Sequence, residues 1–168
     1  MEITVDMIKL LRQKTGAGIM DCKRALEEAA GDADRAVELL RAKGLASAAA
    51  KAGRETREGL VEAYIHAGGR LGALVEVNCE TDFVARTSEL KELTHALAMQ
   101  VAAMPSTSYI DRSEVKEDES RPIEEVCLLE QSYIKDPSRT VRDVVQEAIA
   151  KVGENVRIRR FARFALGE

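Results

Sequence analysis

The spacing between apolar residues changes at Gly59 from that of helices to that of strands, and this change limits the folds that the chain can adopt. Before it, over residues 1–52, apolar residues recur at spacings of three and four, which is typical of amphipathic helices. After it, residues 60–66 and 70–78 alternate in the manner of strands around a short turn at 67–69, which predicts a β-hairpin. A chain with helices first and strands later is expected to be an α+β protein.

Capping residues and glycines delimit the helices expected in the first part of the chain. The first helix follows Thr4 and ends at Gly16, and the second spans residues 19–30. The third helix follows Asp32, and Gly44 is well placed to end it as a C-terminal glycine. Three short helices of this kind predict a small helical domain.

A domain boundary is expected after these helices. Residues 46–50 are rich in helix formers and predict a further short helix, and the polar stretch that follows lies between two glycines. The sequence therefore predicts a helical domain over residues 1–52, a linker over 53–58 and a core domain over 59–168.

The core is expected to add helices and strands to the hairpin, whose second strand, 71–77, is mostly apolar and should be central in the sheet. The further elements are a helix from Ser88 to Pro105, a strand at 126–129, a helix from a capping pair at Thr140 and Asp143 to Gly153, and a strand over 155–166. The apolar phase of the last strand slips near Phe161, which predicts a β-bulge or a change of packing partner. Residues 106–122 are polar and acidic, so we expect a mobile segment there, with early proteolysis.

Composition excludes several classes of protein. The 168 residues contain no run approaching the roughly 18 apolar residues of a membrane span, and the start of the chain lacks a signal-peptide pattern, so we expect a cytoplasmic protein without membrane contact. The cysteines, Cys22, Cys79 and Cys127, are far apart, and the only histidines are His66 and His95, which argues against a disulfide framework or a metal site. The sequence has no phosphate-binding loop and no nucleophile elbow, so we expect neither a cofactor nor enzymatic activity.

Residues 78–86 connect the second strand to the next helix and carry Phe83 directly after Asp82. A phenylalanine in such a connection either packs back onto its own core or is offered to a partner. Packing is the more common outcome for a large apolar side chain. The residues alone leave both interpretations open.

Three separated stretches of the chain resemble the translation elongation factor Ts family, in the family's order. They are Thr15-Gly16-Ala17-Gly18-Ile19-Met20-Asp21-Cys22-Lys23-Arg24-Ala25-Leu26, Thr81-Asp82-Phe83-Val84, and Gly153-Glu154-Asn155-Val156 with Arg159-Arg160-Phe161. The resemblance implies a three-helix, ubiquitin-associated-like head followed by an antiparallel-sheet core with helices packed on it. It also implies a guanine-nucleotide exchange factor for elongation factor Tu. The chain departs from the family by a single copy of the core and by the acidic residues 106–122, where relatives usually carry a helical hairpin.

The resemblance also implies roles for particular residues. Phe83 would wedge into elongation factor Tu near the magnesium ion of the bound nucleotide, and Asp82 would be its polar neighbour. Thr81 and Val84 would shape the loop, and head residues would contact the nucleotide-binding domain of the partner; these are Arg12, Met20 and Lys23. Magnesium and GDP would belong to the partner, and two copies of this chain would pair as short relatives do.

Nucleic-acid binding is the alternative function. The last strand interleaves arginines with Phe161 and Phe164, as in a surface on which bases stack; the arginines are Arg157, Arg159, Arg160 and Arg163. The net charge of −4 argues against this function and favours a strand with one solvated basic face. We therefore expect no direct contact with nucleic acid.

Overall fold

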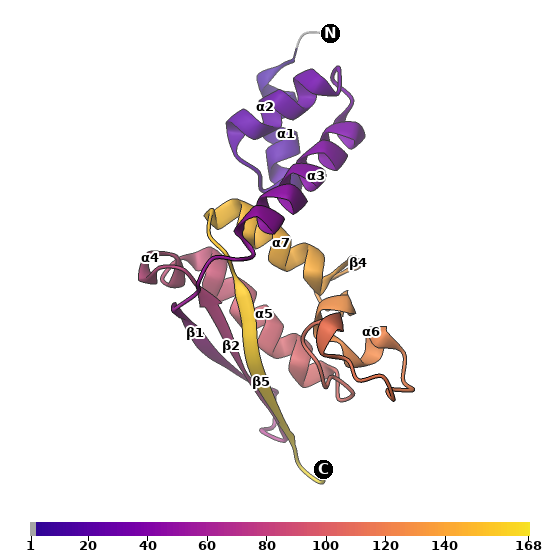
Figure 1. Ribbon diagram of the computed structural model, residues 1–168. Helices are drawn as coiled ribbons and strands as arrows, with labels where there is room; N and C mark the ends of the chain where they lie inside the picture. The colour runs from indigo at the N-terminus through magenta and orange to yellow at the C-terminus, as the bar shows by residue number, and fades with distance from the viewer. Residues whose placement is uncertain (1–2) are drawn as a thin grey trace.

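The computed structural model describes residues 3–168, so the first two residues of the expected 1–52 domain lie outside it. A head of three helices stands above the remainder of the chain (Figure 1). The helices are α1 (Val5–Thr15), α2 (Ile19–Glu28) and α3 (Ala33–Lys51). As predicted, the side chains of Thr4 and Asp32 cap α1 and α3, and Gly16 ends α1 with a left-handed conformation. The head has an apolar cluster of its own, which includes Leu11, Cys22, Leu26 and Ala36.

Helix α3 is longer than predicted and belongs to both parts of the molecule. It does not end at Gly44 but continues to Lys51, so that prediction was wrong. Glycine inside a helix costs only about 1 kcal/mol, and the alanine-rich turns that follow it favour the helix. Packing supplies the rest, because Ala36 is buried in the head cluster whereas Ala48 is buried in the core cluster. The far end of α3 lies along α7 (Val141–Val152) (Figure 1).

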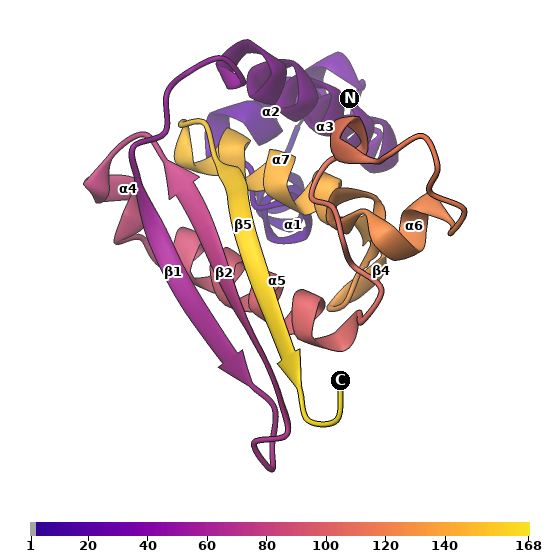
Figure 2. The same cartoon turned by 60° about the horizontal axis from the view of Figure 1, so that its bottom comes forward.

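The core is built on an antiparallel sheet in the order β1-β2-β5. Its strands are β1 (Glu58–Ile65), β2 (Leu71–Cys79) and β5 (Arg157–Ala165), which confirms the hairpin and the central position of the second strand. Helix α5 (Ser88–Ala103) covers one face of the sheet, while the other face is open to solvent (Figure 2). This single covered face explains the alternation that distinguishes the strands in the sequence.

The predicted irregularity in the last strand is confirmed. Glu76 lies opposite Arg160, whereas the next residue, Val77, lies opposite Ile158. Arg159 is therefore the extra residue of a bulge, two positions before Phe161. The bulge restores an inward direction to Ile158, which is buried, and Phe161 packs on the edge of the same core.

Between α5 and α7 the chain follows an irregular path. Its short elements are η1 (Arg112–Glu114), α6 (Ile123–Val126), η2 (Leu128–Glu130), β3 (Ser132–Tyr133) and β4 (Asp136–Thr140). The strand predicted at 126–129 is wrong. Val126, Cys127 and Leu128 are buried in succession, and an apolar run this short does not distinguish a strand from buried helical turns. Only an isolated bridge between Cys127 and Tyr109 resembles the expected pairing.

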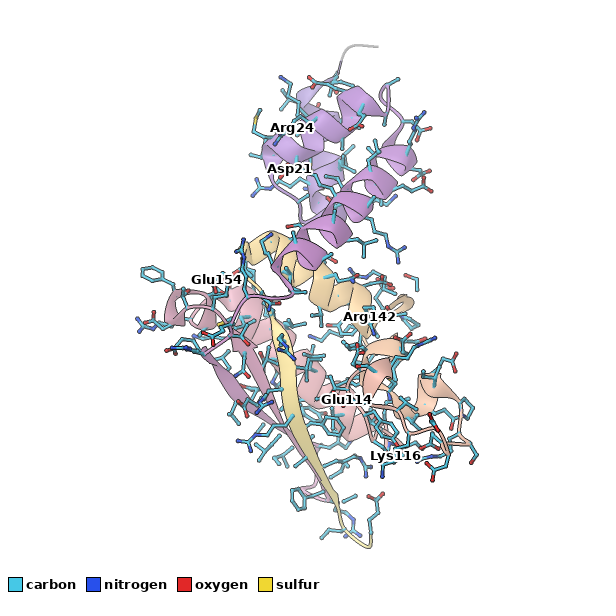
Figure 3. The ribbon with its side chains drawn as sticks, viewed as in Figure 1. Asp21, Arg24, Glu114, Lys116, Arg142 and Glu154 are labelled. Atoms are coloured by element: carbon cyan, nitrogen blue, oxygen red, sulfur yellow. The ribbon has the colours of Figure 1, made fainter. Side chains whose placement is uncertain are left out.

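Residues 106–122 lie against α6 and the beginning of α7. Asp111 forms an ion pair with Arg142 at 2.9 Å, and the Ser108 N–H donates to the Val126 carbonyl at 2.9 Å. Figure 3 shows Arg142 at the end of α7 that is nearest this segment. These contacts fix where the segment lies and do not measure its motion, so the mobility expected there stays a prediction.

Capping residues and a glycine in the sequence predicted the ends of the core helices to within one residue at the positions below. Thr140 and Asp143 form the full capping box at the start of α7, and Gly153 ends this helix in the left-handed region. Thr87, rather than the predicted Ser88, caps α5, a difference of one residue. Cys22, Cys79 and Cys127 are buried and free.

The extension of α3 into the core generates a prediction about truncated chains. A chain of residues 45–168 and a chain of residues 53–168 should both fold, because the core has its own sheet and helices. The shorter chain should melt lower by roughly 5 °C or more, since it lacks buried Ala48 and the Ala52 carbonyl that Asn155 binds. Circular dichroism melts test this. Equal melting temperatures, or a shorter chain that does not fold, would contradict it.

Candidate functional site

The connection after β2 contains one turn of helix, α4 (Asp82–Ala85). Thr81 caps it, because its hydroxyl oxygen accepts a hydrogen bond from the Val84 N–H at 3.4 Å. Val84 and Ala85 are buried in the core cluster, so the turn is anchored on its inner side. The expected loop is therefore a short structured turn at the carboxyl end of the central strand.

Phe83 projects from this turn into solvent. Its side chain is 82% exposed, the largest value among the exposed large apolar residues of the described chain. The alternative in which Phe83 folds back onto its own core is therefore wrong. The backbone places consecutive side chains of a helical turn in different directions, and the inward positions are taken by Val84 and Ala85.

Asp82 lies beside Phe83 and forms an ion pair with Arg86 at the other end of the turn. Both side chains are more than half exposed, so the pair contributes little to stability and is open to exchange with a partner's charges. The turn thus presents a carboxylate next to an aromatic ring.

A carboxylate from another part of the chain supports the base of the turn. Glu154 Oε2 accepts hydrogen bonds from the N–H groups of Glu80 and Thr81, both at 3.0 Å, and Oε1 accepts from the Thr81 hydroxyl at 2.6 Å. In return, Glu80 Oε1 accepts from the Asn155 N–H at 2.7 Å. Figure 3 shows Glu154 at the top of β5, beside α4. The sequence predicted no role for Glu154, Glu80 or Asn155, although Glu154 and Asn155 lie within a stretch that resembles the family.

Cys79, the last residue of β2, is not a reactive group. Its thiol is buried and donates to the Thr81 carbonyl at 3.1 Å. Burial raises the pKa of Cys79 to about 11, and the negative charge of Glu154 adds to the effect. The thiol is therefore protonated at neutral pH and serves as packing beneath the turn.

The head residues singled out in the sequence lie on α1 and α2. Met20 is 61% exposed near the start of α2, and Lys23 on the same helix pairs loosely with Glu27 at 3.7 Å. Arg12 is exposed on α1. These helices lie above the core, whereas α4 lies at the side of the sheet (Figure 1). The structure therefore groups Thr81, Asp82, Phe83 and Val84 in one turn and keeps the head residues apart from them.

An ion-pair cluster joins α2 to α3 in the head. Asp21 accepts hydrogen bonds from Lys43 at 2.5 Å and from Arg24 at 3.1 Å, and the Lys43 contact is the main cause of the lowered pKa of Asp21. Figure 3 shows Asp21 and Arg24 side by side on α2. This cluster links the helix that carries Met20 and Lys23 to α3.

The part of the chain that the structure describes contains no group of three or more His, Cys, Asp and Glu residues arranged to hold a metal ion. His95 binds Glu62 at 3.0 Å, and His66 binds the Tyr64 hydroxyl at 2.9 Å, so both histidines have partners on or near β1. Within residues 3–168, no helix is long and apolar enough to cross a membrane.

The strand considered for nucleic-acid binding has an unfavourable arrangement for base stacking. Phe161 is partly buried against the core cluster, whereas Phe164 is 72% exposed, so only one of the two rings is open to a base. Arg160 is paired with Glu76. These contacts favour a solvated basic strand over a stacking surface.

An exposed aromatic side chain on an anchored turn is typical of a surface that binds another protein. Comparison with known proteins identifies the family. The sequence profile of the family described as Elongation factor TS matches residues 47–121 and 119–168, and its two parts meet inside the acidic segment. The chain belongs to the elongation factor Ts family, and its role is that of a translation elongation factor.

Curated relatives agree over the whole chain. The elongation factor Ts of Carboxydothermus hydrogenoformans is 52% identical over 99% of this chain and 90% of its own length. That of Thermotoga petrophila is 50% identical over 100% of this chain and 98% of its own length. That of Rippkaea orientalis is 48% identical over 99% of this chain and 79% of its own length. The alignment with the first covers 196 residues, more than the 168 of this chain, so that relative has additional residues.

The exposure of Phe83 predicts the effect of its removal on stability. Phe83→Ala should change the free energy of unfolding by less than about 0.5 kcal/mol, because no buried contact is lost. Val84→Ala, one residue further on, should destabilise the protein by about 2 kcal/mol, because Val84 is only 8% exposed. Urea unfolding of both variants tests this, and a Phe83→Ala loss as large as that of Val84→Ala would contradict it.

Proposed function

We propose that this protein is the guanine-nucleotide exchange factor of elongation factor Tu. It binds the GDP-bound form of elongation factor Tu, disturbs the magnesium and phosphate site, and promotes the release of GDP. The observation that carries this proposal is the exposure of Phe83 on a capped, anchored turn within the family stretch Thr81-Asp82-Phe83-Val84. The protein itself contributes no covalent chemistry and acts in the cytoplasm, where elongation takes place.

Exchange follows from thermodynamic linkage. If the protein binds nucleotide-free elongation factor Tu more tightly than the GDP-bound form, it weakens GDP binding by the same factor. The difference in affinity must come from contacts that the nucleotide excludes. A side chain that occupies space beside the magnesium ion makes such contacts, because it takes up the room that the ion and its oxygen ligands need.

Phe83 has the properties that this intrusion requires. Its ring is free of intramolecular contacts that binding would have to break, and it stands on a turn that is already ordered. Binding by a pre-ordered anchor loses little conformational entropy. Asp82 places a negative charge beside the ring, where it competes with phosphate for the hydrogen-bond donors of the partner. Thr81 and Val84 act on the same step by fixing the turn at its cap and its buried side.

The head holds the partner while the turn acts. Met20 offers an exposed, flexible apolar side chain, and Arg12 and Lys23 add positive charge on the same part of the molecule. These residues are proposed to contact the nucleotide-binding domain of elongation factor Tu. Binding and exchange are thereby assigned to different surfaces of one chain.

We further propose that two copies pair through the open face of the sheet. This face carries apolar side chains that a solvated sheet would not be expected to expose, namely Val61, Ile65, Leu74, Phe164 and Leu166. They border shallow grooves along all the strands of the sheet. A second copy would bury this surface and form a two-layer sandwich of sheets.

The exchange step generates the main functional prediction. Phe83→Ala should slow the catalysed release of labelled GDP from elongation factor Tu at least roughly tenfold, because loss of an aromatic interface anchor typically costs about 2 kcal/mol or more. Asp82→Ala should act in the same direction but less. Ile134→Ala, which truncates an exposed apolar residue on the β3–β4 ribbon, should leave the rate unchanged. Stopped-flow fluorescence measures all three, and wild-type exchange by folded Phe83→Ala protein would refute the proposal.

The pairing of two copies predicts a dimer in solution. Light scattering at high micromolar concentration should give twice the mass of one chain, and Phe164→Asp should give a monomer because it buries an unpaired charge in the interface. Val5→Asp places the same charge on an equally exposed apolar position of the head and should remain dimeric. A wild-type monomer would contradict the pairing.

A further inference from the structure

Glu154 lies far from Thr81 in the sequence, yet its carboxylate binds the backbone at the point where β2 ends and α4 begins. The N–H groups of Glu80 and Thr81 lie beyond the paired part of the sheet, and those at a helix start have no partner within the helix. Glu154 Oε2 satisfies both, each at 3.0 Å. A carboxylate that accepts from backbone N–H groups makes stronger hydrogen bonds than a neutral acceptor.

The second oxygen of Glu154 acts on the cap itself. Oε1 accepts a hydrogen bond from the Thr81 hydroxyl at 2.6 Å. Because the hydroxyl proton points at Glu154, the lone pairs of the hydroxyl oxygen are left to accept other hydrogen bonds. The same hydroxyl oxygen accepts the Val84 N–H that begins α4. Glu154 therefore selects the orientation of Thr81 that caps the turn carrying Phe83.

A hydrogen bond in the opposite direction joins Glu80 to Asn155, and Asn155 in turn binds the chain just after α3. Glu80 Oε1 accepts the Asn155 N–H at 2.7 Å, and the buried Asn155 side chain donates to the carbonyls of Ala52 and Arg54. Gly153, with φ of 75°, provides the bend after α7 that places Glu154 and Asn155 in these positions. Backbone from β2, from the α7–β5 connection and from the segment after α3 thus meets at one hydrogen-bonded junction.

We propose that Glu154 is a positioning residue for nucleotide exchange, which holds the turn bearing Phe83 in its outward, ordered conformation. This proposal rests on the proposed function of Phe83. Glu154 does not need to contact elongation factor Tu. Its removal would leave the ring present but the turn uncapped and free to move, and a small misplacement of an acting group is costly.

The experiment compares Glu154→Ala with Glu154→Gln in the full-length protein. The glutamine side chain loses the negative charge but keeps an oxygen that can accept from both backbone N–H groups and an amide that can face the Thr81 hydroxyl. Glu154→Ala should slow GDP release at saturating exchange factor roughly tenfold, because the hydrogen bonds of the cap are lost. Glu154→Gln should recover most of the rate. The concentration that gives half-maximal exchange should stay near the wild-type value for both, since the head surface is unchanged.

Alkylation of Cys79 gives a second readout that does not depend on the partner. Its thiol lies directly beneath the turn and donates to the Thr81 carbonyl, so an opened turn exposes it. At pH 8, mass spectrometry should find Cys79 labelled roughly tenfold faster in Glu154→Ala, with Cys22 and Cys127 as protected as in the wild type. Glu154→Gln controls for the lost charge, which by itself lowers the pKa of Cys79.

The outcomes separate the two proposals. Slower exchange and faster Cys79 labelling in Glu154→Ala, with both largely recovered in Glu154→Gln, support the positioning role. Wild-type exchange and Cys79 protection in Glu154→Ala overturn it, as does equal acceleration of labelling at all three cysteines, which indicates general destabilisation. If Phe83→Ala promotes GDP release at the wild-type rate while Cys79 is still labelled faster in Glu154→Ala, the function proposed for Phe83 is refuted. The structural role of Glu154 in holding the turn would still be supported.

Discussion

The burial of one face of β2 determines where the other parts of the core lie. Val75, Val77 and Cys79 point into the core and are fully buried, and burying a side chain of that size stabilises a protein by about 1.5–3 kcal/mol. A shift of one residue in the register would turn Leu74 and Glu76 inward instead, and an unpaired carboxylate would enter the core. Because β2 pairs on both sides, such a shift would also break two ladders of hydrogen bonds. The carboxyl end of β2 is therefore held in one position relative to the core, and this also fixes where the following turn begins.

This constraint explains how an exposed phenylalanine can stand on an ordered backbone. Val84 and Ala85 fix the inner side of the turn, and Thr81 and Glu154 fix its beginning. Phe83 is left as the outward position, where its ring adds no buried contact to the fold and is open to solvent. The head is joined to this arrangement by α3, whose two ends are buried in different clusters. A continuous helix transmits the position of one part to the other better than a flexible linker would.

Much of the fold could be predicted from the sequence, because its signals are local. The caps at Thr4 and Asp32, the capping box at Thr140, and the alternation of the hairpin each occupy a few neighbouring residues. The errors arose where distant packing decided the outcome. The continuation of α3 through Gly44 depends on burial of Ala48 against the core, and the region 126–129 is an apolar run too short to separate a strand from helical turns.

The candidate turn could be located from the sequence for the same reason. The stretch from Thr81 to Val84 is contiguous, so resemblance to the family identified it. The direction of Phe83 could not be decided from composition, since a core position and an exposed position were both open. Glu154 binds Thr81 across 73 residues, and a hydrogen bond at that separation leaves no periodic or capping signal in a single sequence.

Phe83 itself is proposed to enter elongation factor Tu next to the magnesium site. The most direct measurement replaces Phe83 with the photoreactive residue benzoylphenylalanine and maps the crosslinks formed with nucleotide-free elongation factor Tu. If Phe83 enters this site, crosslinks should form with peptides of the nucleotide-binding domain that line the magnesium site, and excess magnesium and GDP should suppress them. Crosslinks confined to a second copy of this chain, or crosslinks to elongation factor Tu that magnesium and GDP do not suppress, would contradict it.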